Sequence, residues 1–278
     1  MSHSKAFSLL ICLITLVSCS KGLTETYSSD EMRWLRALTD VDLKGRKTGT
    51  EGCLHAASYI CTELVEMGYS PKVEEFSYRD SITMRNIIVE IPGQSDSILI
   101  VGAHYDGAVK SSKYQAANDN ASGVVALLSV AKSIRPNNDT VLLCFWDGEE
   151  NTDGTAFNGS SYFVEHFNKR DYIKWYCNID CCGRDENSIY LYYSPNMIQK
   201  FDDFVIPQDI ALNITRKISE DENSSDYVPF KNKGIPFWGW NDIDVLKYIH
   251  TPNDATKFIS IPKIQSVSYI IRTFINEE

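Results

Sequence analysis

Segments with helical periodicity alternate with short β-branched runs along most of the chain, and this alternation limits the fold more than any other feature. Such a pattern is typical of helices packed on a mostly parallel or mixed sheet. With no linker visible after residue 29, it predicts a single α/β domain with a mixed, mostly parallel central sheet flanked by helices. We expect helices at 31–43, 51–67, 122–134, 160–168 and 262–276, and strands at 72–78, 85–91, 97–103, 140–146, 172–179, 188–193 and 235–240.

The charge balance of the chain restricts its partners. Its 278 residues include 27 lysines and arginines against 37 aspartates and glutamates, a formal net charge of −10. Because a field of this sign repels a phosphate backbone, we expect no nucleic acid partner.

Acidic side chains and one histidine follow three of the predicted strands. They are His104 and Asp106 after the first, Glu149 and Glu150 after the second, and Asp180 after the third. In open α/β sheets, ligands bind in the crevice at the carboxyl ends of the strands. The placement of these residues therefore predicts a functional site at that edge of the sheet.

Gathering these residues in one crevice would concentrate negative charge. Together with Asp119 the site would hold five carboxylates, whose repulsion at low dielectric raises their pKa values or pushes the site apart. Two divalent cations supply enough positive charge to cancel most of this. Zinc binds histidine nitrogen and carboxylate oxygen, and two ions about 3.5–4 Å apart need a bridging carboxylate. These residue types therefore suit a site for two zinc ions.

Five short motifs, in their order and spacing, resemble those of metallopeptidase family 28, the dizinc aminopeptidases. They are His-Tyr-Asp at 104–106, Ala-Asn-Asp-Asn-Ala-Ser-Gly at 117–123, Asp-Gly-Glu-Glu at 147–150, Asn-Ile-Asp at 178–180 and His-Thr-Pro-Asn-Asp at 250–254. The likeness extends from Arg-Lys-Thr-Gly at 46–49 to about Thr256, and it includes Ser-Asp-Tyr-Val-Pro-Phe at 225–230. One motif alone is a weak signal, whereas five in register are strong.

The resemblance implies a role for each metal-binding residue. Asp119 would bridge the two zinc ions. His104 and Asp180 would complete the site of one ion, and Glu150 and His250 the site of the other.

The resemblance also implies that Glu149 is the general base, which takes a proton from water and returns it to the leaving amine. Asp106 lies two residues after His104, so on a continuing strand it faces the same side and accepts the second N–H of that imidazole. We therefore group Asp106 with the catalytic residues. The family pattern further implies a strained peptide bond directly after Asp119.

Aromatic residues beside the predicted ligands are candidates for the substrate pocket. We expect Tyr105, Tyr227 and Tyr248 to line it or to polarise the scissile carbonyl. In some relatives a tyrosine immediately precedes the last histidine, but here Ile249 occupies that place, which leaves the oxyanion donor open.

Two other features depart from the sequence pattern of the family. The segment 151–158 is inserted after the glutamate doublet, is expected to shape specificity, and is similar to loops of glutaminyl cyclases, which share the fold. Cys181 and Cys182 directly follow Asp180, and we expect them to be small buried side chains and not a soft-metal or redox site.

The N-terminus resembles the leader of a bacterial lipoprotein. Lys5 precedes an apolar run at 6–17, which is too short to span a bilayer and is typical of a signal peptide. The run ends in Leu-Val-Ser-Cys at 16–19, which resembles a lipobox whose cysteine, Cys19, becomes lipidated. Ordinary secretion with cleavage nearby is the alternative.

These readings divide the chain into a lipoprotein signal peptide at 1–18, a polar linker at 19–30 and a zinc peptidase domain at 31–278. We expect an exported protein, anchored through Cys19 to a membrane of the bacterial cell envelope on its periplasmic or cell-surface side.

Three functions compete. The leading hypothesis is a zinc aminopeptidase acting on peptides, because the full ligand set is present. A glutaminyl cyclase, which binds a single zinc ion and converts N-terminal glutamine to pyroglutamate, is the alternative. Such enzymes usually place a tryptophan beside the last histidine, so Ile249 favours the peptidase. A non-catalytic, lipid-anchored binding protein is the third hypothesis, but such proteins typically lose metal ligands.

Overall fold

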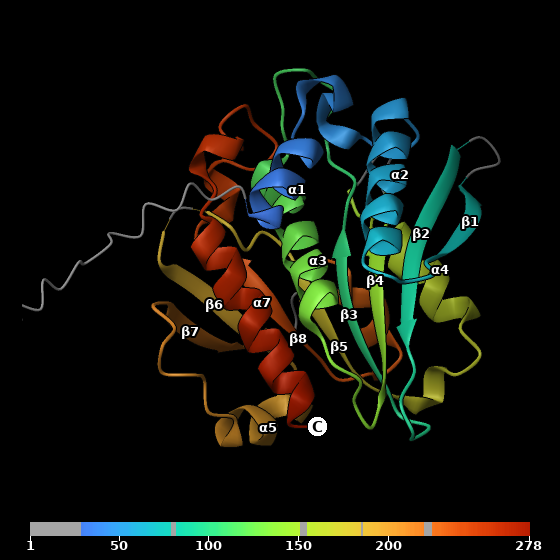
Figure 1. The fold of residues 1–278 in the computed structure, drawn as a ribbon, viewed down its shortest axis with the longest axis vertical. Coiled ribbons are helices and arrows are strands. Elements are labelled where there is room, and N and C mark those ends of the chain that lie inside the picture. Colours follow the sequence, from blue (N-terminus) through green and yellow to red (C-terminus); the bar gives the residue numbers. More distant parts are fainter. Residues whose placement is uncertain (1–28, 79–81, 151–154, 185, 220–223) are drawn as a thin grey trace, which may run out of the picture.

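The computed structural model describes residues 29–78, 82–150, 155–184, 186–219 and 224–278. In these residues an eight-stranded sheet forms the centre of the molecule, in the order β1-β2-β4-β3-β5-β8-β6-β7 (Figure 1). The strands are β1 (Lys72–Tyr78), β2 (Ile82–Ile91), β3 (Ile98–His104), β4 (Thr140–Trp146), β5 (Ile173–Ile179), β6 (Ser188–Tyr193), β7 (Asn213–Ile218) and β8 (Phe237–Asp242).

The sheet is mixed, with more parallel than antiparallel neighbours. β4, β3, β5 and β8 run parallel to one another, and so do β6 and β7. β1 pairs antiparallel with β2, as do β2 with β4 and β6 with β8. The prediction of a mixed, mostly parallel sheet is confirmed. Since β3 lies between β4 and β5, the carboxyl ends of these three strands adjoin at one edge.

Helices cover both faces of the sheet and make a three-layer domain. The longer helices α1, α2, α3 and α7 lie on the face toward the viewer in Figure 1, and α4 lies behind the sheet. The α-helices are α1 (Asp30–Leu38), α2 (Glu51–Glu66), α3 (Gly123–Ser133), α4 (Asn158–His166), α5 (Ile198–Asp203), α6 (Tyr227–Asn232) and α7 (Ile261–Asn276). Shorter helical turns are η1 (Val41–Arg46), η2 (Ala117–Ser122), η3 (Arg170–Tyr172), η4 (Pro195–Met197), η5 (Val245–Lys247) and η6 (Thr256–Phe258).

The period-two alternation of the strands divides the core into two clusters. On β5, Trp175, Cys177 and Ile179 belong to the larger cluster, which includes side chains of α1, α2, α3 and α7. Tyr176 on the same strand belongs to the smaller cluster on the opposite face, with side chains of α4 and α6. A strand buried on both faces reads as a nearly continuous apolar run, which is why these strands are recognisable in the sequence.

The predicted elements agree with the structure except in a few places. The helix expected at 31–43 was wrong in extent: α1 ends at Leu38, and Asp40 then caps the separate turn η1 by accepting a hydrogen bond from the N–H of Asp42 (2.8 Å). β7, α5 and α6 were not predicted, because the two helices have only six residues each and most of β7 is exposed, so their apolar periodicity is weak.

Several predictions fall on other parts of the chain. The leader, Cys19 and most of the linker lie outside the described residues, as do residues 151–154 of the insertion. Across the described ranges, no helix is both long and apolar enough to cross a bilayer. The six described cysteines are free, and all except the half-buried Cys61 are buried, as expected of small apolar side chains.

Candidate metal centre

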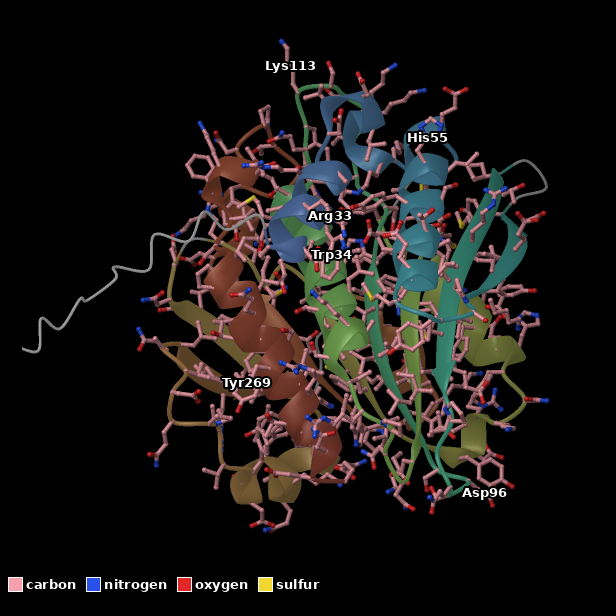
Figure 2. The ribbon with its side chains drawn as sticks, viewed as in Figure 1. Arg33, Trp34, His55, Asp96, Lys113 and Tyr269 are labelled. Carbon is pink, nitrogen blue, oxygen red and sulfur yellow. The ribbon has the colours of Figure 1, made fainter. Side chains whose placement is uncertain are left out.

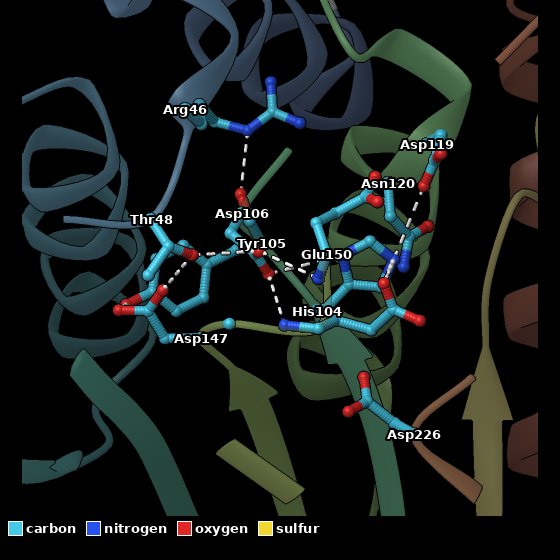
Figure 3. Close-up of polar contacts among 12 residues, drawn as sticks. Arg46, Thr48, His104, Tyr105, Asp106, Asp119, Asn120, Asp147, Glu150 and Asp226 are labelled. Carbon is cyan, nitrogen blue, oxygen red and sulfur yellow. Dashed lines mark hydrogen bonds and ion pairs between the residues drawn. The ribbon is translucent and has the colours of Figure 1, made fainter. Parts of the chain in front are cut away.

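The predicted ligands converge at the carboxyl edge of the sheet. His104 is the last residue of β3, Asp180 directly follows β5, and Glu150 lies in the turn after β4. Asp119 lies in η2, the tight turn before α3, and His250 in the loop after η5. Figure 3 shows His104, Glu150 and Asp119 turned toward the same space. The structure therefore brings together all five side chains that the sequence analysis singled out as ligands.

These five side chains form two groups of three that share Asp119. In the first group, His104 Nε2 lies 3.5 Å from Asp119 Oδ1 and 3.4 Å from Asp180 Oδ1.

In the second group, His250 Nε2 lies 3.1 Å from Asp119 Oδ2 and 3.1 Å from Glu150 Oε1. The two oxygens of one carboxylate thus face two different groups, which is the arrangement that a bridging ligand requires.

The spacing of these atoms fits zinc. Two atoms that each lie about 2.0–2.1 Å from a tetrahedral zinc ion are about 3.3–3.4 Å apart, close to the separations in both groups. Within the described residues, His104 Nε2 and Asp180 Oδ1 are also buried without a hydrogen-bond partner, which leaves both atoms available to a ligand. Histidine nitrogen with carboxylate oxygen is a donor set that zinc accepts.

In the metal-free protein, burial and neighbouring charges shift the pKa values of the side chains in this centre. Burial, reinforced by the charge of Glu150, raises the pKa of Asp119 to about 7. Burial also raises the pKa of Glu149, against the opposing effect of His104. Hydrogen bonds to Asp119 and Glu150 raise the pKa of His250 to about 10. Protons therefore partly take the place of cations when the centre is empty.

We expect the metal-free protein to lose stability as the pH rises. The ordinary pKa of Asp119 is 3.8 and its folded pKa is about 7, so between these values the folded state holds a proton that the unfolded state has released. The free energy of unfolding then falls with rising pH. The pKa of Asp254, raised by burial to about 6, acts with the same sign.

Calorimetry in a chelator should show Tm falling by at least about 5 °C between pH 5 and pH 8. A smaller decline is expected in the zinc-loaded control, because zinc binds the deprotonated ligands. A metal-free protein that becomes more stable over this pH interval would contradict the assignment.

Asp106 is fully buried beneath the glutamate doublet, where it has one predicted contact and others that were not predicted. Its Oδ1 lies 3.5 Å from His104 Nδ1, on the side expected for orienting that imidazole. In addition, Oδ1 accepts a hydrogen bond from the backbone N–H of Glu149 and Oδ2 from that of Glu150, both at 3.1 Å. One carboxylate therefore holds the turn that carries the proposed base and a proposed ligand.

Asp254 holds the backbone at Asp119, the proposed bridging ligand. Its carboxylate accepts hydrogen bonds from the backbone N–H groups of Asn118 (2.6 Å) and Asp119 (3.1 Å). The peptide bond between Asp119 and Asn120, where the family pattern implied a departure from ordinary geometry, is cis. The sequence analysis quoted Asp254 only as the end of a motif, and that motif was the available signal for its role.

Ser225 is a second supporting residue that the sequence analysis did not single out. Its hydroxyl donates to Asp180 Oδ2 (2.8 Å), while Asn178 Nδ2 donates to the serine oxygen (2.9 Å). Asp180 Oδ1 is thereby left toward His104. Ser225 opens the quoted Ser-Asp-Tyr motif, which was the signal available.

The three predicted pocket tyrosines are almost fully buried. Tyr105 differs from the expectation: it packs in the core, and its hydroxyl lies 2.7 Å from the Arg85 carbonyl and 3.1 Å from Asp147 Oδ2, so we assign it a structural role.

Tyr227 stacks on Phe237, with ring centroids 4.5 Å apart. The Tyr248 hydroxyl accepts a hydrogen bond from Asn118 Nδ2 (2.9 Å). For these two tyrosines a contact with substrate stays a prediction.

Arg46 is a fully buried arginine that the sequence analysis quoted only within a motif. Its guanidinium donates to the carbonyl oxygens of Tyr105 (2.8 Å), Gln115 (3.0 Å), Ala116 (2.9 Å) and Leu38. Figure 3 shows its bond to the carbonyl of Tyr105. Arg46 thus joins α1, the end of β3 and the segment leading to Asp119.

The cysteine pair after Asp180 and the insertion after Glu150 are the remaining features. Cys181 and Cys182 are buried and free, as expected. In the described end of the insertion, the N–H groups of Phe157 and Asn158 donate to the carbonyls of Glu149 (3.1 Å) and Gly148 (2.9 Å), so the insertion returns to the glutamate turn. His55 is exposed on α2 (Figure 2) and belongs to neither group of candidate ligands.

Comparisons with known proteins agree on one family. The model of Peptidase family M28 matches residues 86–275. The chain is 27% identical over 203 residues to leupeptin-inactivating enzyme 1 of Streptomyces exfoliatus, which covers 70% of this chain and 44% of that protein. It is 27% identical over 198 residues to aminopeptidase YwaD of Bacillus subtilis, 65% of this chain and 41% of the relative. The chain thus spans less than half the length of these two relatives.

A third relative has a different activity in its name. The chain is 21% identical over 285 residues to glutaminyl-peptide cyclotransferase of Drosophila melanogaster, covering 88% of this chain and 80% of that protein. Among solved structures, a leucine aminopeptidase precursor from Bacteroides thetaiotaomicron superposes with a TM-score of 0.72 at 17% identity, over 89% of this chain and 96% of that one. This last likeness concerns the fold.

Proposed function

The chain belongs to peptidase family M28, and from that premise we propose that it is a zinc-dependent aminopeptidase that holds two ions. The observation that carries the proposal is the double use of Asp119, whose two oxygens face two separate groups of ligand atoms. His104 and Asp180 would hold one ion with it, and Glu150 and His250 the other. Zinc bound there would supply Lewis acidity, which polarises a peptide carbonyl and acidifies water.

In this proposal Glu149 moves the proton. Its carboxylate belongs to neither ligand group, yet Oε2 lies 3.9 Å from His104 Nε2, at the mouth of the first group. Because burial raises its pKa, the carboxyl can hold a proton taken from water and pass it to the leaving amine. Asp106 keeps the base in place through the backbone N–H of Glu149.

A glutaminyl cyclase is the second candidate. The Drosophila relative, named as a cyclotransferase, aligns over 80% of its length. Two features favour the peptidase. The described residues contain two groups of candidate ligands, whereas a cyclase needs only one zinc ion. In addition, Ile249 precedes His250, at a place where cyclases usually have tryptophan. A non-catalytic binding protein is less well supported, because the full ligand set and Glu149 are present.

A short peptide that begins with glutamine separates the candidates. After incubation with the zinc-loaded protein, mass spectrometry should show the loss of the whole first residue, because the proposed centre hydrolyses the first peptide bond. The controls are an enzyme-free sample and one with a chelator. Loss of ammonia alone would replace the aminopeptidase by the cyclase, and a purified protein that never holds zinc would support the binding protein.

We also propose the export and lipid anchoring expected from the leader. The support is the apolar run and the lipobox-like sequence that ends at Cys19. A mature N-terminus whose mass lacks acyl chains would contradict this proposal.

A further inference from the structure

Two buried carboxylates share one hydroxyl group beneath the glutamate turn. Thr48 Oγ1 lies 3.0 Å from Asp106 Oδ2 and 3.0 Å from Asp147 Oδ1 (Figure 3). All three side chains are at most 4% exposed. In the described parts of the chain, no lysine, arginine or histidine forms an ion pair with Asp147, whereas Asp106 faces His104 Nδ1 at 3.5 Å. A negative charge on Asp147 would therefore be the less compensated of the two.

The single hydrogen of the Thr48 hydroxyl does not suffice for both contacts if both carboxylates are ionised. A threonine hydroxyl has one hydrogen, and an ionised carboxylate has none to donate, so Thr48 can satisfy only one of its two contacts. Tyr105 has the same difficulty, since its hydroxyl lies 2.7 Å from the Arg85 carbonyl, an obligate acceptor, and 3.1 Å from Asp147 Oδ2. One additional proton on Asp147 Oδ1 completes the contact to Thr48.

The number of backbone donors distinguishes the two acids. Asp106 accepts the N–H groups of Glu149 and Glu150 and faces His104 Nδ1, so it has two donors besides Thr48. Asp147 accepts a single backbone N–H, from Arg85 at 3.0 Å.

The titratable groups that face Asp147 act in opposite directions. The charge of Asp106, from the segment after β3, favours the neutral form, whereas the Cys53 thiol of α2 donates to Oδ1 (3.4 Å) and favours the ionised form. The hydroxyl of Tyr105 lies 3.1 Å from Oδ2. Burial, followed by the charge of Asp106, raises the pKa of Asp147 to about 6.

We propose that in mildly acidic solution Asp147 is a neutral carboxylic acid that donates a hydrogen bond to Thr48, and that Thr48 in turn donates to Asp106 and orients it beneath the Glu149–Glu150 turn. Asp147 and Thr48 are then positioning residues that act through Asp106. The effect on metal binding rests on the proposed function, in which Glu150 is a ligand, whereas the protonation state of Asp147 does not depend on it.

Paired isosteric variants test the order of the donors. Asp147→Asn keeps a neutral side chain that can donate to Thr48, so zinc affinity at pH 6 should stay within about threefold of the unmodified protein. Asp106→Asn removes an acceptor of two backbone N–H groups, and we expect a loss of about 10–100-fold. Thr48→Val should weaken zinc binding, and Thr48→Ser should restore it, because serine keeps the hydroxyl.

An infrared spectrum tests the protonation state itself. The spectrum of Asp147→Asn is subtracted from that of the zinc-loaded unmodified protein at pH 5.5. The difference spectrum should contain the carbonyl band of a protonated carboxylic acid, and labelling with ¹³C-aspartate should shift this band. Absence of this band would overturn the proposal.

A zinc affinity of Asp147→Asn as low as that of Asp106→Asn would also overturn it, and so would an Asp147→Asn protein that fails to fold. If the unmodified protein binds no zinc, the proposed function fails, but the band recorded without metal still decides the state of Asp147.

Discussion

Replacing Glu149 by alanine is expected to lower kcat for peptide hydrolysis by about 10²–10⁴-fold while zinc stays bound. The side chain belongs to neither ligand group, so its loss removes no metal donor. It does remove the buried carboxyl beside His104 that has a raised pKa and that we propose transfers the proton. Steady-state kinetics and the zinc content of the same preparation are the measurements.

The matched control for this variant is Glu165→Ala, which changes an exposed glutamate of α4. Its kcat should equal that of the unmodified protein. Glu149→Gln should be as inactive as Glu149→Ala, because an amide cannot accept the proton. Activity retained in Glu149→Ala would remove this residue from the role of base, and loss of zinc would identify it as a ligand instead.

Replacing Arg46 by methionine is expected to lower the free energy of unfolding by about 3–5 kcal/mol. Methionine fills much of the same space but donates no hydrogen bond, so the buried carbonyls of Tyr105, Gln115, Ala116 and Leu38 lose their partner. An unmade buried hydrogen bond costs about 1–3 kcal/mol. Denaturant titration of the zinc-loaded protein measures the change in free energy. Thermal unfolding of the same protein should show a decrease in Tm of about 10 °C.

Arg36→Met is the control for Arg46→Met, since Arg36 is exposed on α1. Its stability should change by less than about 0.5 kcal/mol. Arg46→Lys should recover only part of the loss, because an ammonium lacks the fork of five donors. If Arg46→Met unfolded within about 1 kcal/mol of the unmodified protein, the network around this guanidinium would have no structural importance.

The sequence predicts the central part of the fold well, and the reason is burial on both faces. β3, β4 and β5 are apolar runs without alternation, bounded by turn residues, so their positions are predicted to within a residue. The edge strand β7 has mostly exposed side chains, and it pairs only with β6 among the described residues. Its position depends on tertiary pairing, which has no local signal in the chain.

The metal centre shows a similar division. The five proposed ligands follow strands or sit in motifs, so residue type and position predict them. The groups that support those ligands, such as Thr48 and Asp254, act through hydrogen bonds to residues far away in the sequence. No spacing in the sequence relates Thr48 to Asp147, because the two meet only after α2 and β4 have packed. Such partners can be identified only in the three-dimensional structure.

The scattering of the centre along the chain has a consequence for synthesis of the protein. His104 and Asp119 emerge from the ribosome before His250 and Asp254, which follow β8. A chain synthesised only as far as β8 therefore lacks His250, which completes the second group of candidate ligands, and the acceptor that holds the backbone at Asp119. The proposed hydrolytic activity thus requires synthesis at least as far as Asp254.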